Sequence, residues 1–268
     1  MTEIDIDRFK GWIGRSRETT DVVTDALVSK FRATFGARLA PSDGAAPLGI
    51  HWCLSPEIVP PEELAPDGHP ERGSFLPPVP LPSRMWAGGE IRFHAPLVAG
   101  DTVRRVSTIA DVALKSGRNG PLVFVTVEHQ HRVGERLAIT DIQNLVYKDR
   151  TAAAALPAAW DHPSGALVAD PVLLFRYSAI TFNGHRIHYD RDYATTQEFY
   201  PGLVVHGPLQ ATLLMNHAAR LKGSTPALFG YRGLSPLFES QPFHLKNADG
   251  EVWVEDTAGH KTMAASYS

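Results

Sequence analysis

Two parts of the chain share one plan, in which a segment with helical periodicity comes before several strand-like runs. Residues 21–35 place apolar side chains at helical spacing, and Gly36 is positioned to end that helix. Residues 86–147 then read as consecutive antiparallel strands separated by turn residues. In the second half, a helix with Pro208 in its first turn is expected to run to Leu221, and strand-like runs follow it. The pattern predicts an α+β fold with two similar halves.

A short similarity at an offset of 140 residues supports a duplication. Residues 151–165 are rich in alanine and proline and lack a regular pattern, which is typical of a linker. We therefore predict an N-terminal half (1–150), a linker (151–165) and a C-terminal half (166–268). The residues that correspond at this offset are Arg92 with Arg232, Pro96 with Pro236, Leu97 with Leu237, Val98 with Phe238 and Val103 with Phe243.

Residues 41–82 interrupt the first half with a segment rich in proline and glycine. Proline lacks a backbone N–H, so this composition excludes long helices and central strands here. The segment is expected to be a long excursion. It contains His69, and a flap over an acyl-binding site is one interpretation, whereas a packed surface loop is the other.

Charge and cysteine content exclude several classes of protein. The 26 Lys and Arg residues are balanced by 29 Asp and Glu residues, so no basic excess indicates a nucleic-acid partner. The single cysteine, Cys53, rules out an internal disulfide and a zinc site with several cysteines, which fits a reducing compartment. The acidic start does not resemble a signal or transit peptide, and no apolar run approaches the roughly 20 residues that span a bilayer. These features predict a cytoplasmic protein.

The densest polar cluster lies in residues 177–190, which bring an amide, two imidazoles, a guanidinium and a carboxylate together. Histidine exchanges protons near neutral pH, so this segment is a candidate site for acid–base chemistry. The alternative is that its histidines only bond to the backbone. His185 and His188 are three residues apart, but Asp190 would complete a metal site only with strained geometry. We therefore expect neither a metal nor another cofactor.

Gly207 comes directly before the predicted second helix. The free amides and positive dipole at a helix start stabilise a carbonyl oxygen that gains negative charge, and glycine leaves room for that oxygen. A purely structural alternative is that Gly207 permits a tight turn into the helix.

The sequence resembles the MaoC-like, R-specific enoyl-thioester hydratases and dehydratases. Their loop reads approximately G-D-x-N-P-x-H-x-D-x-x-Y-A, and His188, Asp190, Tyr193 and Ala194 fall in register. The resemblance is closer to the mitochondrial 3-hydroxyacyl-thioester dehydratase type and to bacterial mesaconyl-C4-CoA hydratases. The strings that carry it are FNGHRIHYD (182–190), DGHPERGSFLPPVPLPSRMWAGG (67–89) and VVHGPLQATLL (204–214).

The resemblance implies a double hotdog, with two antiparallel sheets that each wrap around one helix. The N-terminal half would hold the acyl group and the C-terminal half would carry the chemistry. Proteins of this plan often associate further, so a homodimer is plausible.

One position departs from the family pattern. Asn183 stands where the broader family has its catalytic aspartate, and an amide cannot act as a general base. The resemblance therefore implies a single-base mechanism, in which the thioester carbonyl meets the Gly207 amide and a water lies between Asn183 and His188. His188 would take a proton from that water and return a proton to Cα on the same face.

Further residues are candidates for binding the substrate. Arg84 and Arg186 could bind CoA phosphates or a substrate carboxylate, although surface arginines are usually only solvated. Trp86 could line the pocket or belong to the core. His206 is the fourth candidate. Arg186 lies beside His188 in the sequence and slightly favours a short dicarboxylic substrate.

These observations predict a hydro-lyase that adds water to an enoyl-CoA-type or acyl-carrier thioester, or removes it. A thioesterase is the first alternative, because one fold supports many activities. The second is a non-catalytic acyl-CoA-binding protein that has lost its aspartate. The length and charge of the acyl chain stay open.

Overall fold

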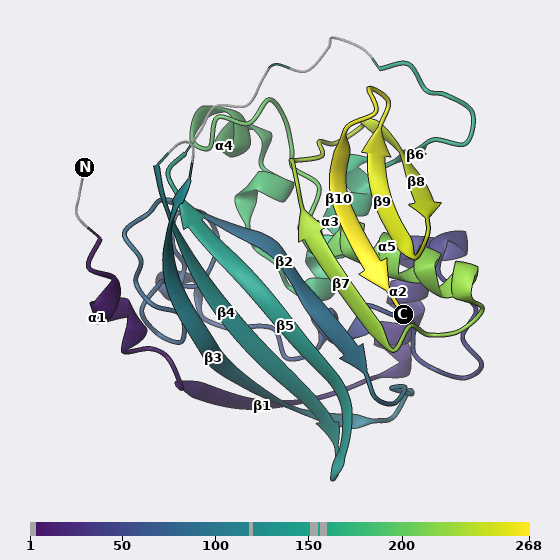
Figure 1. The fold of residues 1–268 in the computed structure, drawn as a ribbon, viewed down its shortest axis with the longest axis horizontal. Coiled ribbons are helices and arrows are strands. Elements are labelled where there is room, and N and C mark those ends of the chain that lie inside the picture. Colours follow the sequence, from purple (N-terminus) through teal and green to yellow (C-terminus); the bar gives the residue numbers. More distant parts are fainter. Residues whose placement is uncertain (1–3, 118–119, 151–154, 156–159) are drawn as a thin grey trace.

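The computed structural model describes residues 4–117, 120–150, 155 and 160–268. Its strands form one ten-stranded antiparallel sheet in the order β1-β3-β4-β5-β2-β7-β10-β9-β8-β6 (Figure 1). The strands are β1 (Ser16–Val22), β2 (Ser83–Phe93), β3 (Thr102–Gly117), β4 (Gly120–Val133), β5 (Arg136–Lys148), β6 (Leu167–Val168), β7 (Leu228–Gly233), β8 (Pro242–Ala248), β9 (Glu251–Asp256) and β10 (Lys261–Tyr267).

The strand order of one half mirrors that of the other about the pairing of β2 with β7. At this seam Gly88 lies opposite Arg232 and Ile91 lies opposite Phe229. Two sheets that were expected to be separate are therefore continuous. The arrangement agrees with the predicted duplication, since an offset of 140 residues relates positions on β2 to positions on β7. The predicted linker (151–165) falls largely outside the described residues, so the domain boundaries stay a prediction.

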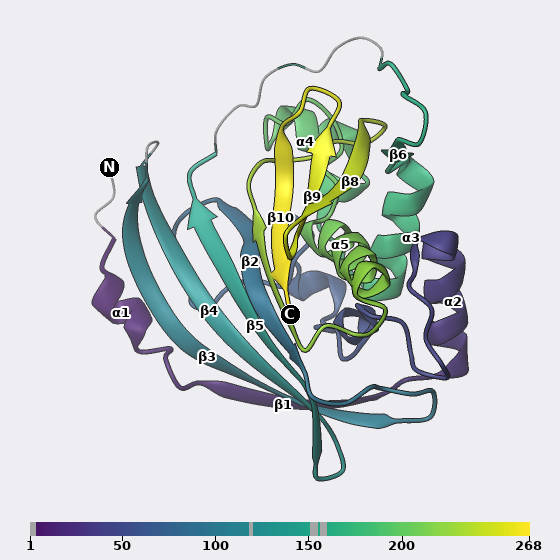
Figure 2. The same cartoon turned by 45° about the vertical axis from the view of Figure 1, so that its right-hand side comes forward.

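Helix α5 (Gly207–Lys222) lies against the C-terminal half of the sheet and contacts β7, β8, β9 and β10 (Figure 2). It buries Leu209, Leu213 and Leu214 completely or nearly so. Gly223 ends it in the left-handed conformation with φ 76°. The helix predicted over residues 208–221 is thus confirmed, and apolar burial fixes its position.

The first predicted helix begins later than expected. Asp21 and Val22 belong to strand β1, where they pair with Val103 and Thr102. Helix α2 (Asp25–Phe35) starts after Thr24, whose side chain accepts the Leu27 amide, so this N-cap sets its start. The helix packs against α3 (Pro171–Thr181).

The proline-rich excursion has the predicted lack of long elements. Between α2 and β2 it contains only the short 3-10 turns η1 (Gly36–Arg38), η2 (Ile50–Cys53) and η3 (Pro61–Glu63). Its apolar side chains cover the N-terminal half of the sheet, where Val79 and Leu81 join one buried cluster with Val123. The absence of a long helix between α2 and β2 thus agrees with the prediction, because repeated prolines cannot supply helical hydrogen bonds.

The remaining helices are short. They are α1 (Ile6–Lys10), η4 (Arg186–His188) and α4 (Arg191–Thr196). None of the described helices is long and apolar enough to cross a membrane.

Candidate active site

His188 occupies a loop between α3 and α4 that is anchored at both ends. Helix α3 ends at Phe182 in the left-handed conformation, and the Asn183 amide donates to the Ser178 carbonyl at 2.9 Å. His188 Nδ1 contacts the Val204 carbonyl at 2.7 Å. A carbonyl only accepts, so Nδ1 carries the proton and Nε2 keeps its lone pair. Burial lowers the pKa of His188 to about 4, so its imidazole is neutral at neutral pH and can accept a proton.

His206 lies directly behind His188. The two rings stack with centroids 3.6 Å apart and planes inclined by 19°. His206 Nε2 bonds to Ser178 Oγ at 2.8 Å, and the imidazole is completely buried. We predicted a substrate-binding role for His206. Its contacts instead favour the positioning of His188, because the ring is enclosed by protein.

Asn183 lies on the same loop, and its side chain takes part in a local turn. Its Oδ1 accepts the His185 amide at 3.0 Å. An amide oxygen has two lone pairs, so one remains for a water molecule. The turn fixes the direction of the chain toward His188.

The structure brings Gly207 beside His188, because Gly207 follows His206 at the start of α5. The amides of the first helical turn have no acceptor within the helix. A Cβ at Gly207 would lie 2.9 Å from Trp86 Cε3. Glycine is therefore required for close packing against Trp86. This structural role of Gly207 does not exclude the predicted role of its amide in binding a carbonyl oxygen. Trp86 stacks in turn on Tyr231, with ring centroids 4.4 Å apart.

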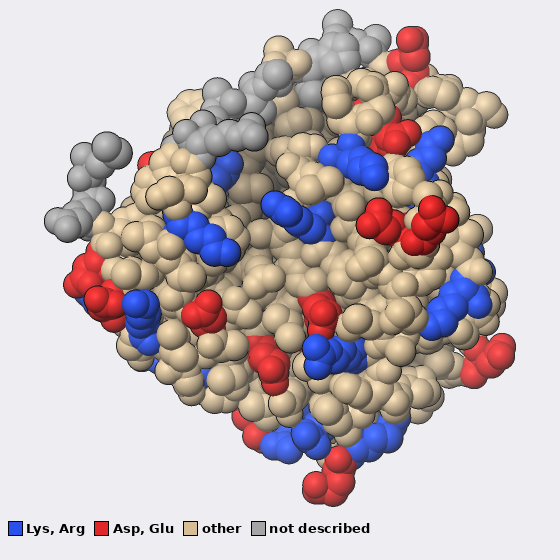
Figure 3. Space-filling model, viewed as in Figure 1, with Lys and Arg blue, Asp and Glu red and all other residues tan. Residues whose placement is uncertain are grey.

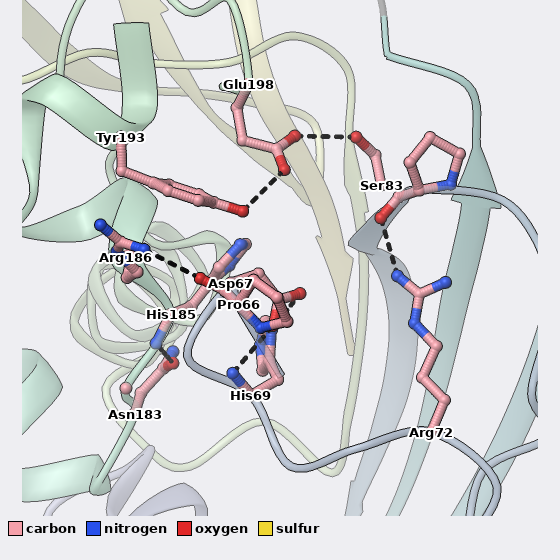
Figure 4. A network of polar contacts seen from close by, with 12 residues as sticks. Pro66, Asp67, His69, Arg72, Ser83, Asn183, His185, Arg186, Tyr193 and Glu198 are labelled. Atoms are coloured by element: carbon pink, nitrogen blue, oxygen red, sulfur yellow. Dashed lines mark hydrogen bonds and ion pairs between the residues drawn. The ribbon is translucent and has the colours of Figure 1, made fainter. Parts of the chain in front are cut away.

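Residues 66–69, here called the flap, lie against the loop that carries His188 (Figure 4). The Arg186 amide donates to the Asp67 carbonyl at 2.9 Å. Gly68 and Gly184 make a backbone contact so close that a Cβ on Gly68 would overlap the Gly184 carbonyl oxygen. This position is compatible with both predicted interpretations, a flap and a packed loop, so a role as a flap stays a prediction.

The flap places Asp67 and His69 in the site. Asp67 Oδ2 contacts His69 Nδ1 at 3.2 Å, and Asp67 Oδ1 accepts the His69 amide at 2.9 Å. The His69 ring lies 4.1 Å from that of His185, which lies 5.3 Å from that of His188. Three imidazoles thus form a row that ends at a carboxylate. We predicted no role for Asp67 from the sequence. It is the first residue of the segment 67–89, which carries part of the family resemblance, and that position could have indicated it.

Asp67, His69 and His185 place their donor atoms within 4.8 Å of one another, so the described residues contain one candidate cation site. Two observations argue against a metal. Both oxygens of Asp67 already bond to His69. Arg84 also lies close enough to lower the pKa of His69 and His185, and a nearby positive charge opposes a dication.

The two candidate arginines have different surroundings. Arg186 is engaged, since it pairs with Asp190 at 2.8 Å, donates to the Pro66 carbonyl at 3.0 Å and lies over the Tyr193 ring. These contacts favour a structural role in holding the flap. Arg84 is half-buried on β2, and its guanidinium has no hydrogen bond or ion pair to any residue in the described ranges. The guanidinium of Arg84 is therefore the better candidate for binding an anionic group of the substrate.

Glu198 is a buried residue that sequence reasoning did not single out. Its carboxylate accepts from Ser83 Oγ at 2.9 Å and from the Tyr193 hydroxyl at 3.3 Å (Figure 4). It also accepts from Arg150 Nη2 at 2.9 Å. It thus connects the segment after α4 to the start of β2, next to Arg84. No local sequence pattern indicates this role, because its partners lie far apart in the chain.

Comparisons with known proteins agree on family and fold. A family model described as hydroxyacyl-thioester dehydratase type 2 matches residues 49–239. A mesaconyl-C(4)-CoA hydratase from Chloroflexus aurantiacus is 46% identical, over 87% of this chain and 86% of that protein. The mitochondrial hydroxyacyl-thioester dehydratase type 2 from Schizosaccharomyces pombe is 28% identical, over 88% of this chain and 91% of that protein.

Solved structures confirm the predicted double hotdog. Mycobacterium tuberculosis HtdX superimposes with a TM-score of 0.66 at 16% identity, over 94% of this chain and 99% of that one. A second M. tuberculosis protein, described as having a double hotdog fold, gives a TM-score of 0.58 at 15% identity, with 95% of each chain covered. At such identities these structures establish the fold alone.

Proposed function

The chain belongs to the hydroxyacyl-thioester dehydratase type 2 family, and from this premise we propose that it reversibly adds water to the double bond of an enoyl-CoA-type thioester. The relatives named above are hydratases and dehydratases, which are lyases that act on thioesters. The observation that supports the proposal most directly is the neutral His188, whose Nδ1 is held by the Val204 carbonyl beside the start of α5.

In the proposed mechanism, the thioester carbonyl accepts from the Gly207 amide, and the water contacts Asn183 and His188. His188 Nε2 removes a proton from the water while the water oxygen bonds to Cβ. The electron pair of the double bond moves toward the carbonyl, where the helix terminus stabilises the negative charge as it develops. The imidazolium then returns the proton to Cα on the same face, which gives syn addition.

For the acyl group we propose a short dicarboxylic chain. The relative from Chloroflexus aurantiacus is named for a mesaconyl thioester. Arg84 and Trp86 are two residues apart on β2, so they project from the same face of the strand. Arg84 therefore points to the side on which Trp86 meets Gly207. This supports a guanidinium close to the acyl group, where it can bind a second carboxylate.

One assay separates the candidate activities. Purified protein is mixed with enoyl-CoA and unsaturated dicarboxyl-CoA thioesters, and the conjugated enoyl absorbance and free thiol are recorded together. Hydration removes the absorbance without releasing thiol. Thiol release would identify a thioesterase instead, while tight binding without either signal would identify an acyl-CoA-binding protein.

Other partner predictions are unchanged. On the face in Figure 3, lysine and arginine side chains are interspersed with carboxylates, and the absence of a nucleic-acid partner stays a prediction from the charge balance. A cytoplasmic location, a homodimer and the choice between CoA and a carrier protein stay predictions from the sequence.

A further inference from the structure

Protonation of His188 creates a charge that its surroundings do not balance. The ring contacts the Val204 carbonyl and the imidazoles of His206 and His185. Among the described residues, no carboxylate pairs with it. A buried cation without a counter-charge is strongly disfavoured, so an imidazolium at this position needs a partner to share its proton.

The nearest arrangement that can carry the charge lies on the flap. Asp67 Oδ2 lies 3.2 Å from His69 Nδ1, so a protonated His69 would be paired with a carboxylate. The bond to Nδ1 leaves His69 Nε2 as the basic nitrogen. The ring of His185 lies between those of His69 and His188, and the flap is held there by Arg186 and by the contact of Gly68 with Gly184.

We propose that the Asp67–His69 pair is a second proton-transfer group of this site, supplied by the flap in place of the carboxylate that Asn183 lacks. His69 receives, through His185, the proton that His188 removes from water, and the proton then returns along the same row of imidazoles to His188, which delivers it to Cα. The inference rests on the proposed hydration. One water O–H bond breaks, one C–O and one C–H bond form, and the proton that leaves the water returns to carbon, so no other reactant is needed.

The charges around His69 fit this role. It faces Asp67 and Arg72 from the excursion, Arg84 from β2, and His185 from the loop. Burial and then Arg84 lower its pKa, while Asp67 raises it, and the resulting pKa is about 4. His69 is therefore neutral at neutral pH, and Asp67 increases its proton affinity.

The first test is Asp67→Asn, which keeps an oxygen for the His69 amide but removes the charge. We expect kcat to fall by about 100-fold with KM changed less than about threefold, as for loss of an acid–base group. The acidic limb of the pH profile should move to lower pH, because His69 loses the carboxylate that raises its pKa. Glu71→Gln is the matched control, since Glu71 is an exposed carboxylate just beyond the flap.

The second test is His69→Ala with added imidazole. We expect a similar loss of kcat and recovery of at least about tenfold with imidazole, which a purely structural defect would not show. The inference would be overturned if both variants kept the wild-type kcat while the wild type hydrates its substrate and His188→Ala loses activity. The proposed hydratase function would stand in that case. The inference would also be overturned if the wild type bound one zinc ion per chain and His69→Ala bound none, because the three residues would then form a metal site. If the wild type hydrates nothing, the proposed function itself fails.

Discussion

The imidazoles of His188 and His206 stack at 3.6 Å, and this contact joins the catalytic loop to the start of α5. Burial is the main cause that lowers the pKa of both rings. Because both rings are buried, both imidazoles are neutral at neutral pH, which is the state that a base requires of His188. Ser178 fixes the far side of the stack through His206 Nε2.

Replacement of His188 by alanine should lower kcat by at least about 100-fold, since a general base contributes roughly 10²–10⁴-fold. The loss follows from the missing Nε2 lone pair. Rates of enoyl absorbance loss measure it, and circular dichroism tests whether the fold is intact. A folded variant with near wild-type turnover would remove His188 from the base role.

Ser178→Ala should have a smaller effect of a different kind. The substitution leaves His206 Nε2 buried without its partner, which costs about 1–3 kcal/mol of unfolding free energy. Because His206 supports His188, kcat should fall several-fold while KM for the thioester stays nearly constant. Urea denaturation and steady-state kinetics on the same preparation check both effects. Unchanged stability and unchanged kcat would show that the stack does not depend on this bond.

Gly207→Ala should disturb the site through Trp86. The added Cβ would lie 2.9 Å from Trp86 Cε3, and overpacking of this kind costs about 1–3 kcal/mol. The start of α5 or Trp86 must shift, so we expect kcat to fall. A double-mutant cycle with Trp86→Phe provides the control, because a smaller ring should relieve part of the defect. Strictly additive losses in the cycle would show that this contact is not the cause.

Arg84→Gln and Arg186→Gln should separate binding from structure. Without Arg84, KM for a thioester whose acyl chain carries a free carboxylate should rise by about tenfold or more. KM for a thioester without a free carboxylate should change little. Arg84 also lowers the pKa of His69, so the acidic limb should move to higher pH. Arg186→Gln should instead loosen the flap, which limited proteolysis can detect. An equal rise of KM for both thioesters in Arg84→Gln would argue against a carboxylate contact.

Local patterns predicted those parts of the fold that depend on local forces. Helix α5 has apolar positions at helical spacing and ends at Gly223, and β3, β4 and β5 are rich in branched residues. Helix α3 was missed because it is apolar around much of its circumference and has little periodicity. Strand β10 was also missed, because its sequence KTMAASY contains a single β-branched residue, Thr262.

The residues of the candidate site also fall into two groups, those that a local sequence pattern predicts and those that only the folded chain brings together. His188, Asn183 and Gly207 could be predicted because each lies in a recognisable segment. The contact of the flap with the loop depends on Gly68 meeting Gly184, which lie more than 100 residues apart. No spacing rule connects such positions, so the row of imidazoles that ends at Asp67 could be found only in the folded chain.

Asp141→Asn should stabilise the protein at neutral and alkaline pH. Asp141 is completely buried, and desolvation raises its pKa from 3.8 to about 6. The folded state therefore binds the Asp141 proton more tightly than the unfolded state does. The free energy of unfolding that this proton contributes is lost as pH rises from about 4 to 6. Above pH 6 the buried charge costs about 3 kcal/mol, at 1.36 kcal/mol for each pH unit.

Asparagine removes this charge and keeps an oxygen for Trp52 Nε1, which donates to Asp141 at 2.9 Å. Urea denaturation of both proteins at pH 4 and pH 8 measures the effect, with the exposed Asp43→Asn as the matched control. The variant should gain most over the wild type at pH 8 and little or nothing at pH 4. A difference that is equal at both pH values would mean that Asp141 has an ordinary pKa in the folded protein. A larger gain at pH 4 would require Asp141 to be stabilised as a carboxylate, with Arg105, whose charge lowers its pKa, as the balancing cation.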